Sequence, residues 1–141
     1  MLNSTQIAIV GNVGNAPELR FTPTGTPVAQ FSVAVPQRKY NKETRSWADN
    51  GTTWYRVNAW RELAEHAAES LTTGARVTVI GSLASRDWET EGKSGTSWEI
   101  TADDIGASLM FATVAITRAN RHSVPIPDDP WATDQTTPAT E

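Results

Sequence analysis

The chain has 141 residues, about the length of one domain, which is enough to bury a sizeable core. It contains no cysteine, which excludes disulfides, thiolate metal sites and a cysteine nucleophile. The net charge of −4 argues against a nucleic-acid partner, but its distribution weakens that argument. Residues 119–141 hold one basic and four acidic side chains, whereas residues 1–118 hold 11 basic and 12 acidic ones.

Three strands are predicted in the first half of the chain. Residues 5–13 are rich in branched apolar side chains, while residues 27–36 and 53–60 alternate between two kinds of side chain, as a strand with two different faces does. Residues 15–26 carry the prolines and glycine of a connecting loop, with a short extended piece at 19–21.

A helix and further strands are predicted in the second half. Residues 61–71 have apolar side chains at helical spacing. Residues 75–88 and 97–105 form the next two strands, and Gly81 relieves curvature in the first of them. The apolar, β-leaning residues 109–119 supply an additional strand.

The order of these elements predicts an all-β fold. Strand, strand, strand, helix, strand, strand is the order of a five-stranded OB barrel with one helix between its third and fourth strands. The extra C-terminal strand follows the barrel, so residues 1–118 form one domain. Residues 119–141 are rich in proline, threonine and acidic residues and have almost no aliphatic periodicity, which predicts a disordered tail.

Two polar hairpins are predicted, at residues 37–52 and 86–96. The first carries Tyr40 and Trp47 together with a basic cluster that is opposed only by Glu43. That cluster consists of Arg38, Lys39, Lys42 and Arg45. A solvated loop would account for such a cluster equally well, so the cluster alone does not identify a function.

The strand at 53–60 has two faces of different composition, because successive side chains of a strand point to opposite sides. One face carries Trp54, Arg56, Asn58 and Trp60, and the other carries Tyr55, Val57 and Ala59. The first set suits a surface that stacks flat π-systems and holds negative charge. The alternative is a half-buried strand whose tryptophans simply pack in a core.

Aromatic rings with a nearby cation recur along the chain. Tyr40, Trp54, Trp60 and Trp88 each have a basic residue within two positions. Aromatic platforms for the bases and cations along the backbone are typical of proteins that hold single-stranded nucleic acid without reading its sequence. The predicted binding residues are Arg38, Lys39, Tyr40, Lys42, Arg45, Trp54, Arg56, Trp60, Arg86 and Trp88.

The remaining aromatic residues are interpreted differently. Phe21, Phe31 and Phe111 lie on apolar faces and are predicted to pack in the core. Trp98 begins a strand and Trp47 lies in a loop, and the sequence assigns neither of them to a face.

A catalytic site would need convergent groups, and the carboxylate pairs do not supply them. Asp103 and Asp104 are neighbours on a predicted strand, so their side chains point to opposite faces and suit a shared metal poorly. No nucleophile-elbow, zinc-helix or Walker-type motif occurs. The sequence predicts no enzyme, no metal and no cofactor; a nuclease using Asp103 and Asp104 is the competing hypothesis.

Three motifs follow one another in order along the predicted domain. The first spans Gly11–Gly14 and Pro17–Phe21, the second Thr53–Val57 and Trp60–Glu65, and the third Gly74–Trp88. Together they resemble the bacterial single-stranded DNA-binding protein (SSB) family. The resemblance implies an OB fold, usually a homotetramer, that wraps single-stranded DNA without sequence specificity or catalysis. The base-stacking aromatics that it implies are Tyr40, Trp54, Trp60 and Trp88.

The segment after the barrel resembles one branch of that family. Asp103–Gly106 and Ser108–Thr113 are similar to the actinobacterial members, in which an extra strand clamps neighbouring subunits. Family members typically end in an acidic tip closing with Pro-Phe, which recruits replication and repair enzymes, whereas this chain ends in Pro-Ala-Thr-Glu. A similar acidic run lies within the predicted tail, and its residues are candidate partner-binding residues: Asp128, Asp129, Pro130 and Trp131.

The sequence therefore predicts non-sequence-specific binding and protection of single-stranded DNA in replication, recombination and repair. The alternative is an OB-fold adaptor that binds RNA or a protein partner. No apolar run approaches the ~20 residues of a membrane span, and the N-terminus lacks the features of a signal peptide. A cytoplasmic, nucleoid-associated protein with no membrane partner is expected.

Overall fold

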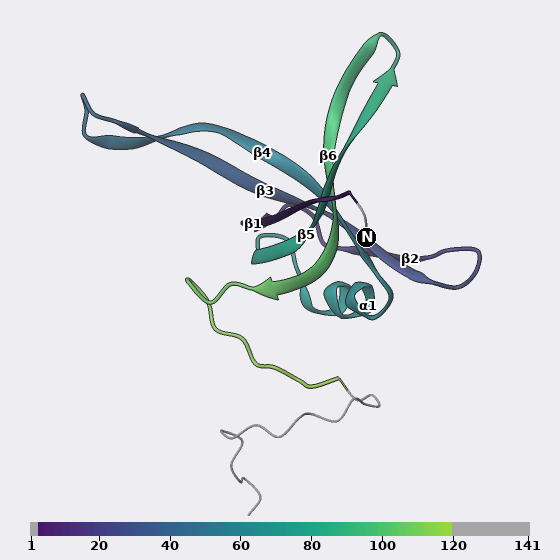
Figure 1. The fold of residues 1–141 in the computed structure, drawn as a ribbon. Coiled ribbons are helices and arrows are strands. Elements are labelled where there is room, and N and C mark those ends of the chain that lie inside the picture. The colour runs from purple at the N-terminus through teal and green to yellow at the C-terminus, as the bar shows by residue number, and fades with distance from the viewer. Residues whose placement is uncertain (1–2, 120–141) are drawn as a thin grey trace, which may run out of the picture.

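The computed structural model describes residues 3–119. In this part of the chain, segments in which apolar and polar side chains alternate form strands. The described chain is mostly β with one short helix (Figure 1). Its elements are β1 (Thr5–Val13), β2 (Glu18–Phe21), β3 (Pro27–Asn41), β4 (Ser46–Trp60), α1 (Arg61–Ser70), β5 (Arg76–Thr90) and β6 (Lys93–Ala107). The helix lies between β4 and β5, which confirms its predicted place in the order.

The strands pair in a closed circuit. β1 pairs antiparallel with β5, β5 antiparallel with β6, β6 parallel with β4, and β4 antiparallel with β3. The end of β1 then pairs with β3 through Asn12 opposite Ala34 and Val13 opposite Val33. β2 adds to the outer edge of β3. The circuit thus joins five strands, and the short piece predicted at 19–21 is a sixth strand.

Two glycines let backbones approach each other closely in this circuit. A Cβ on Gly11 would collide with the carbonyl oxygen of Ala34, where β1 meets β3. A Cβ on Gly81 would collide with the carbonyl oxygen of Thr101, where the register of β5 and β6 shifts. Glycine is the residue that tolerates such approaches, so both positions set how tightly the strands can curve.

The core lies inside the circuit. The largest fully buried side chains are Val13, Val33, Val57, Val77, Val79 and Ile100, and Phe31 is buried beside them, as predicted. A smaller cluster of Ala29, Ala59 and Ala64 joins β3, β4 and α1. Small side chains at that contact let the helix lie close to the sheet, so the core holds β4 rigidly from one side.

The two predicted hairpins are present, and their strands are longer than the sequence indicates. β3 continues to Asn41 and β4 begins at Ser46, while β5 and β6 meet at a turn of two residues. Both hairpins project away from the body of the sheet (Figure 1). Their side chains are almost all exposed, so backbone hydrogen bonds rather than apolar burial extend these strands.

The segment after β6 is apolar and exposed. Residues 108–119 carry no strand, so the additional C-terminal strand stays a prediction that a single chain does not test. Phe111 is 82% exposed and Phe21 is 61% exposed, so the prediction that these two pack in the core is wrong for the described chain. Within residues 3–119, no helix is long and apolar enough to cross a membrane.

Candidate nucleic-acid interface

The two faces predicted for the strand at 53–60 are confirmed in β4. Val57 and Ala59 are fully buried, and Tyr55 packs partly against the core. On the other side, Trp54 is 55% exposed and Trp60 is 43% exposed. The tryptophans therefore do not pack inside the protein, which removes the core interpretation of this strand.

Neighbouring strands add to this outer face. Parallel pairing places Glu99 of β6 beside Arg56, and antiparallel pairing places Ala84 of β5 beside Glu99. Because side chains alternate along β5, Arg86 and Trp88 share the face of Ala84. Arg86 confirms this placement, because its Nη1 lies 3.5 Å from Oε2 of Glu99. Trp88 is 45% exposed.

The β3–β4 hairpin brings further aromatic residues to the same face. Tyr40 lies opposite Trp47, with ring centroids 5.2 Å apart and planes at 61°. Between Pro36 and Arg38 the register shifts, so that two residues of β4, Asn50 and Gly51, oppose the single residue Gln37 of β3. This bulge in β4 brings Trp47, instead of Ala48, onto the side of Tyr40.

Trp47 is the interface residue that the sequence does not assign. Alternation along β3 from Ala34, the partner of Trp54, places Arg38 and Tyr40 on the outer face, and Trp47 lies there with Tyr40. Trp47 is 60% exposed. The available signal is Gly51, whose φ of 93° is the backbone conformation that favours glycine and marks the bulge. We define the outer face by its aromatic and basic residues: Arg38, Tyr40, Trp47, Trp54, Arg56, Trp60, Arg86 and Trp88.

The other predicted basic residues lie elsewhere on this hairpin. Alternation places Lys39 on the opposite side from Tyr40. Lys42 and Arg45 lie in the turn between β3 and β4, where Oδ1 of Asn41 accepts a hydrogen bond from the amide of Glu43 at 2.8 Å. Among residues 3–119, the five cations Arg38, Lys39, Lys42, Arg45 and Arg56 make no ion pair. They are therefore available to an anionic ligand.

Trp98 belongs to the opposite side of the sheet. It lies two residues before the buried Ile100, and it is in register with Tyr55 of β4. It is 43% exposed, so its exposure resembles that of Trp60 while its direction differs. Exposure alone does not distinguish the tryptophans of this protein; the register does.

The side chains of the outer face are suited to binding a flat, negatively charged ligand. Flat aromatic surfaces and exposed basic side chains on one face suit stacked bases with phosphates between them. The stretch from residue 3 to residue 119 contains no group of three or more metal-ligating side chains. The candidate partner-binding residues Asp128, Asp129, Pro130 and Trp131 lie outside the described residues.

Comparison with known proteins places this chain in a family. Residues 4–108 match the Single-strand binding protein family. The single-stranded DNA-binding protein of Mycobacterium tuberculosis H37Rv is 46% identical over an alignment of 146 residues, gaps included. The alignment covers 93% of this chain and 89% of that protein. The protein of the same name from Mycolicibacterium smegmatis is 46% identical over 122 residues, which cover 86% of this chain and 74% of that protein.

A solved structure is similar as well. The crystal structure of the small single-stranded DNA-binding protein from Streptomyces coelicolor superposes with a TM-score of 0.69 and 39% sequence identity, covering 77% of this chain and 97% of that one. These relatives come from actinobacteria, the branch that the sequence motifs resemble. The matched residues include all of β1 to β6. The chain belongs to the single-strand binding protein family.

Proposed function

We propose that this chain binds single-stranded DNA without sequence specificity, by stacking bases on the tryptophans of the outer face and holding phosphates with its arginines. The observation that carries the proposal is that Trp54, Trp60 and Trp88 lie exposed on one face together with Arg56 and Arg86. Folding leaves these large apolar surfaces exposed to water, which is unfavourable in free energy. A flat ligand that covers them removes the surfaces from water, and this burial favours binding.

The chemistry of the face explains the lack of sequence preference. Each stacked base contributes roughly 1–3 kcal/mol, and every base has a π-face, so stacking does not distinguish among the four bases. Arg56 and Arg38 make no ion pair with another described residue, so each can pair with a phosphate without first giving up a carboxylate partner. Affinity then depends on strand length and salt, and little on sequence.

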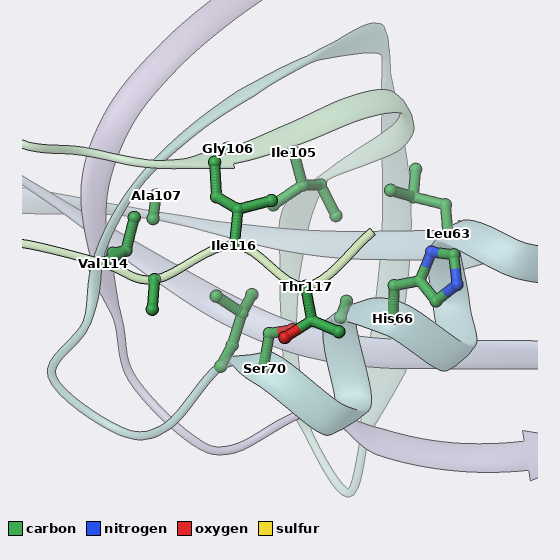
Figure 2. A pocket seen from close by; sticks show the side chains of 12 residues that line it. Leu63, His66, Ser70, Ile105, Gly106, Ala107, Val114, Ile116 and Thr117 are labelled. Carbon is green, nitrogen blue, oxygen red and sulfur yellow. The ribbon is translucent and has the colours of Figure 1, made fainter. Parts of the chain in front are cut away.

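The proposal extends to the architecture and the assembly. The closed circuit of β1, β3, β4, β5 and β6 supports an OB barrel. Leu109, Met110, Phe111 and Ile116 are all more than 60% exposed in a single chain. Figure 2 shows the segment that carries Val114, Ile116 and Thr117 running between α1 and the end of β6. The segment lines a groove of about 420 Å³ together with Leu63 and Ile105. Apolar surface of this extent supports a homotetramer in which other copies cover the segment.

The experiment that tests binding uses the intrinsic fluorescence of the tryptophans. Titration of the protein with poly(dT) should quench the emission strongly, because bases stack on exposed rings. Added salt should reverse the quenching, because it weakens phosphate contacts. Unchanged emission at micromolar protein would refute the proposal. Competition by RNA or by a protein, in preference to poly(dT), would instead favour an adaptor role.

A second measurement tests the assembly. Light scattering or native mass spectrometry should give about 61 kDa, four times the chain mass of 15.3 kDa. A mass of one or two chains would refute the tetramer and leave the binding proposal standing. A role in replication, recombination and repair, with partners recruited through Asp128–Trp131, is proposed on the family resemblance alone.

A further inference from the structure

Gly14 lies against the ring of Trp54. A Cβ added to Gly14 would stand 2.7 Å from Cζ3 and 3.3 Å from Cη2 of that ring, closer than carbon atoms normally approach. The amide of Gly14 donates a hydrogen bond to the carbonyl of Ser32 on β3 at 2.7 Å, which fixes the glycine in place. The ring of Trp54 therefore reaches from β4 across β3 and touches bare backbone.

Gly95 has the same relation to Trp88. The two residues face each other directly in the β5–β6 hairpin. A Cβ added to Gly95 would stand 2.6 Å from Cζ2, 2.9 Å from Cε2 and 3.1 Å from Nε1 of Trp88. An aromatic ring laid over a cross-strand glycine restores the packing that the glycine lacks. Two tryptophans of the outer face thus each pack their ring against a glycine.

Space, and not backbone conformation, is what requires glycine at these two positions. The glycines with positive φ are Gly25, Gly51, Gly74 and Gly92, and neither Gly14 nor Gly95 is among them. An alanine could adopt either backbone conformation, so its methyl group would act only by displacing the ring. Gly106 offers the matched comparison, because it also lacks a positive φ and a Cβ there would meet nothing within 4 Å.

We propose that Gly14 and Gly95 are positioning residues for single-stranded DNA binding: each holds one tryptophan ring against the sheet in the orientation on which a base stacks. This inference rests on the proposed function. A ring already held in the free protein loses little rotamer freedom when a base covers it, so less of the stacking energy is spent on ordering the ring. A lifted ring would have to be ordered by the DNA itself.

The structural half of the inference is tested without DNA. The indole N–H resonances of Trp54 and Trp88 are assigned in a nitrogen–proton correlation spectrum by their absence from Trp54→Ala and Trp88→Ala. Gly14→Ala should shift the Trp54 resonance and Gly95→Ala the Trp88 resonance, while Gly106→Ala leaves both in place. If neither glycine variant moves its own indole resonance, the inference is wrong whatever the protein binds.

The functional half is tested by affinity for oligo(dT). Gly14→Ala and Gly95→Ala should each weaken binding roughly three- to tenfold, a part of the loss expected when the whole ring is removed. Gly106→Ala should change binding less than twofold. In the double variants Gly14→Ala/Trp54→Ala and Gly95→Ala/Trp88→Ala, the glycine change should add less than twofold to the loss caused by the tryptophan change.

The outcomes separate the two proposals. Failure of the unmodified protein to bind oligo(dT) refutes the proposed function, and the indole shifts still report on the ring contacts. Normal binding by both glycine variants refutes the positioning role. An equal loss with and without the tryptophan also refutes it, because the glycine would then act through the backbone. Gly95 lies in an exposed hairpin outside the core, so its variant keeps the test open if Gly14→Ala fails to fold.

Discussion

The tryptophans of the outer face differ from Trp98 in direction, although all of them are similarly exposed. Trp54 and Trp88 each rest on a glycine, and Trp98 follows the alternation of the buried Ile100. A binding function that depends on the outer face should therefore depend on the first two and not on the third. This difference provides a control within one residue type.

Trp54→Ala and Trp88→Ala should each reduce the free energy of binding to oligo(dT) by roughly 1–3 kcal/mol, because each removes one stacking platform. Both rings lie outside the core, so the melting temperature should change little. Trp98→Ala serves as the control and should bind as the unmodified protein does. An equal loss in all three variants would mean that the register does not decide which rings contact DNA.

Glu99 lies between two arginines of the outer face. It is beside Arg56 in the parallel pairing and 3.5 Å from Arg86. Its side chain is 18% exposed while that of Arg86 is 71% exposed, so the carboxylate is fixed within the sheet and the guanidinium remains accessible. A phosphate must compete with this carboxylate for Arg86.

Glu99→Gln should therefore strengthen binding several-fold at low salt and steepen its salt dependence by about 0.7 in logarithmic slope, the contribution of one phosphate contact on a single strand. Glu89→Gln makes the same change of charge on the opposite face of β5 and should leave both quantities unaltered. Fluorescence titrations at several salt concentrations give both. Weaker binding by Glu99→Gln would show that Glu99 serves to orient Arg86.

At the scale of elements, the β3–β4 hairpin combines a regular ladder with one bulge. The bulge sets which side chains of the outer half of β4 face the same way as Trp54. Gly51 makes it possible, because its φ of 93° would strain any residue with a side chain. The outer part of the hairpin, from Pro36 on β3 to Trp54 on β4, carries no core residue. A change there therefore affects the interface more than the fold.

Gly51→Ala should weaken oligo(dT) binding several-fold, because the bulge shifts and Trp47 leaves the face of Tyr40, while the melting temperature falls by only a few degrees. Gly25→Ala is the matched control. Gly25 has a φ of 90°, and at both glycines a Cβ would meet nothing within 4 Å, but Gly25 lies in the turn between β2 and β3. Equal binding by the two variants would argue against a role for the bulge.

The elements also show which parts of the structure can be predicted from the sequence. Both faces of β4 follow from the two-residue alternation of Val57 and Ala59 with Trp54 and Trp60, because burial of one face fixes the register. The bulge does not follow, since Asp49-Asn50-Gly51 suits a turn as well as an extra residue in a strand. The outer hairpin strands do not follow either, because polar residues held by backbone hydrogen bonds leave no apolar pattern.

At the scale of the whole molecule, the negative net charge does not describe the outer face, which is basic. The chain carries −4 overall, yet Arg38, Arg56 and Arg86 lie on a single face among aromatic rings. Local charge governs the approach of a charged ligand more than the total does. The sequence reveals the basic cluster but not its division, because only the fold separates Arg38 from Lys39.

Binding should therefore weaken with salt despite the negative total charge. Arg38 and Arg56, which make no ion pair with another described residue, predict a slope of log affinity against log salt concentration at least as steep as about −1.4 per chain, at roughly −0.7 for each phosphate contact on a single strand. Arg56→Gln should reduce the steepness by about 0.7, and Trp98→Ala should leave it unchanged. A slope near zero in the unmodified protein would mean that stacking alone holds the strand.

The closed circuit of strands has a consequence for how the chain folds. β1 is made first, yet it pairs with β5, beginning with Thr5 opposite Leu83, which is 78 positions later in the chain. During synthesis most of the first strand, apart from the end that pairs with β3, must therefore wait with its hydrogen-bonding groups unpaired until more than half of the chain has emerged. Contacts between such distant positions slow folding to milliseconds or seconds. The circuit of strands closes only when these distant positions have met, so refolding should be slow compared with that of a helical domain of the same length.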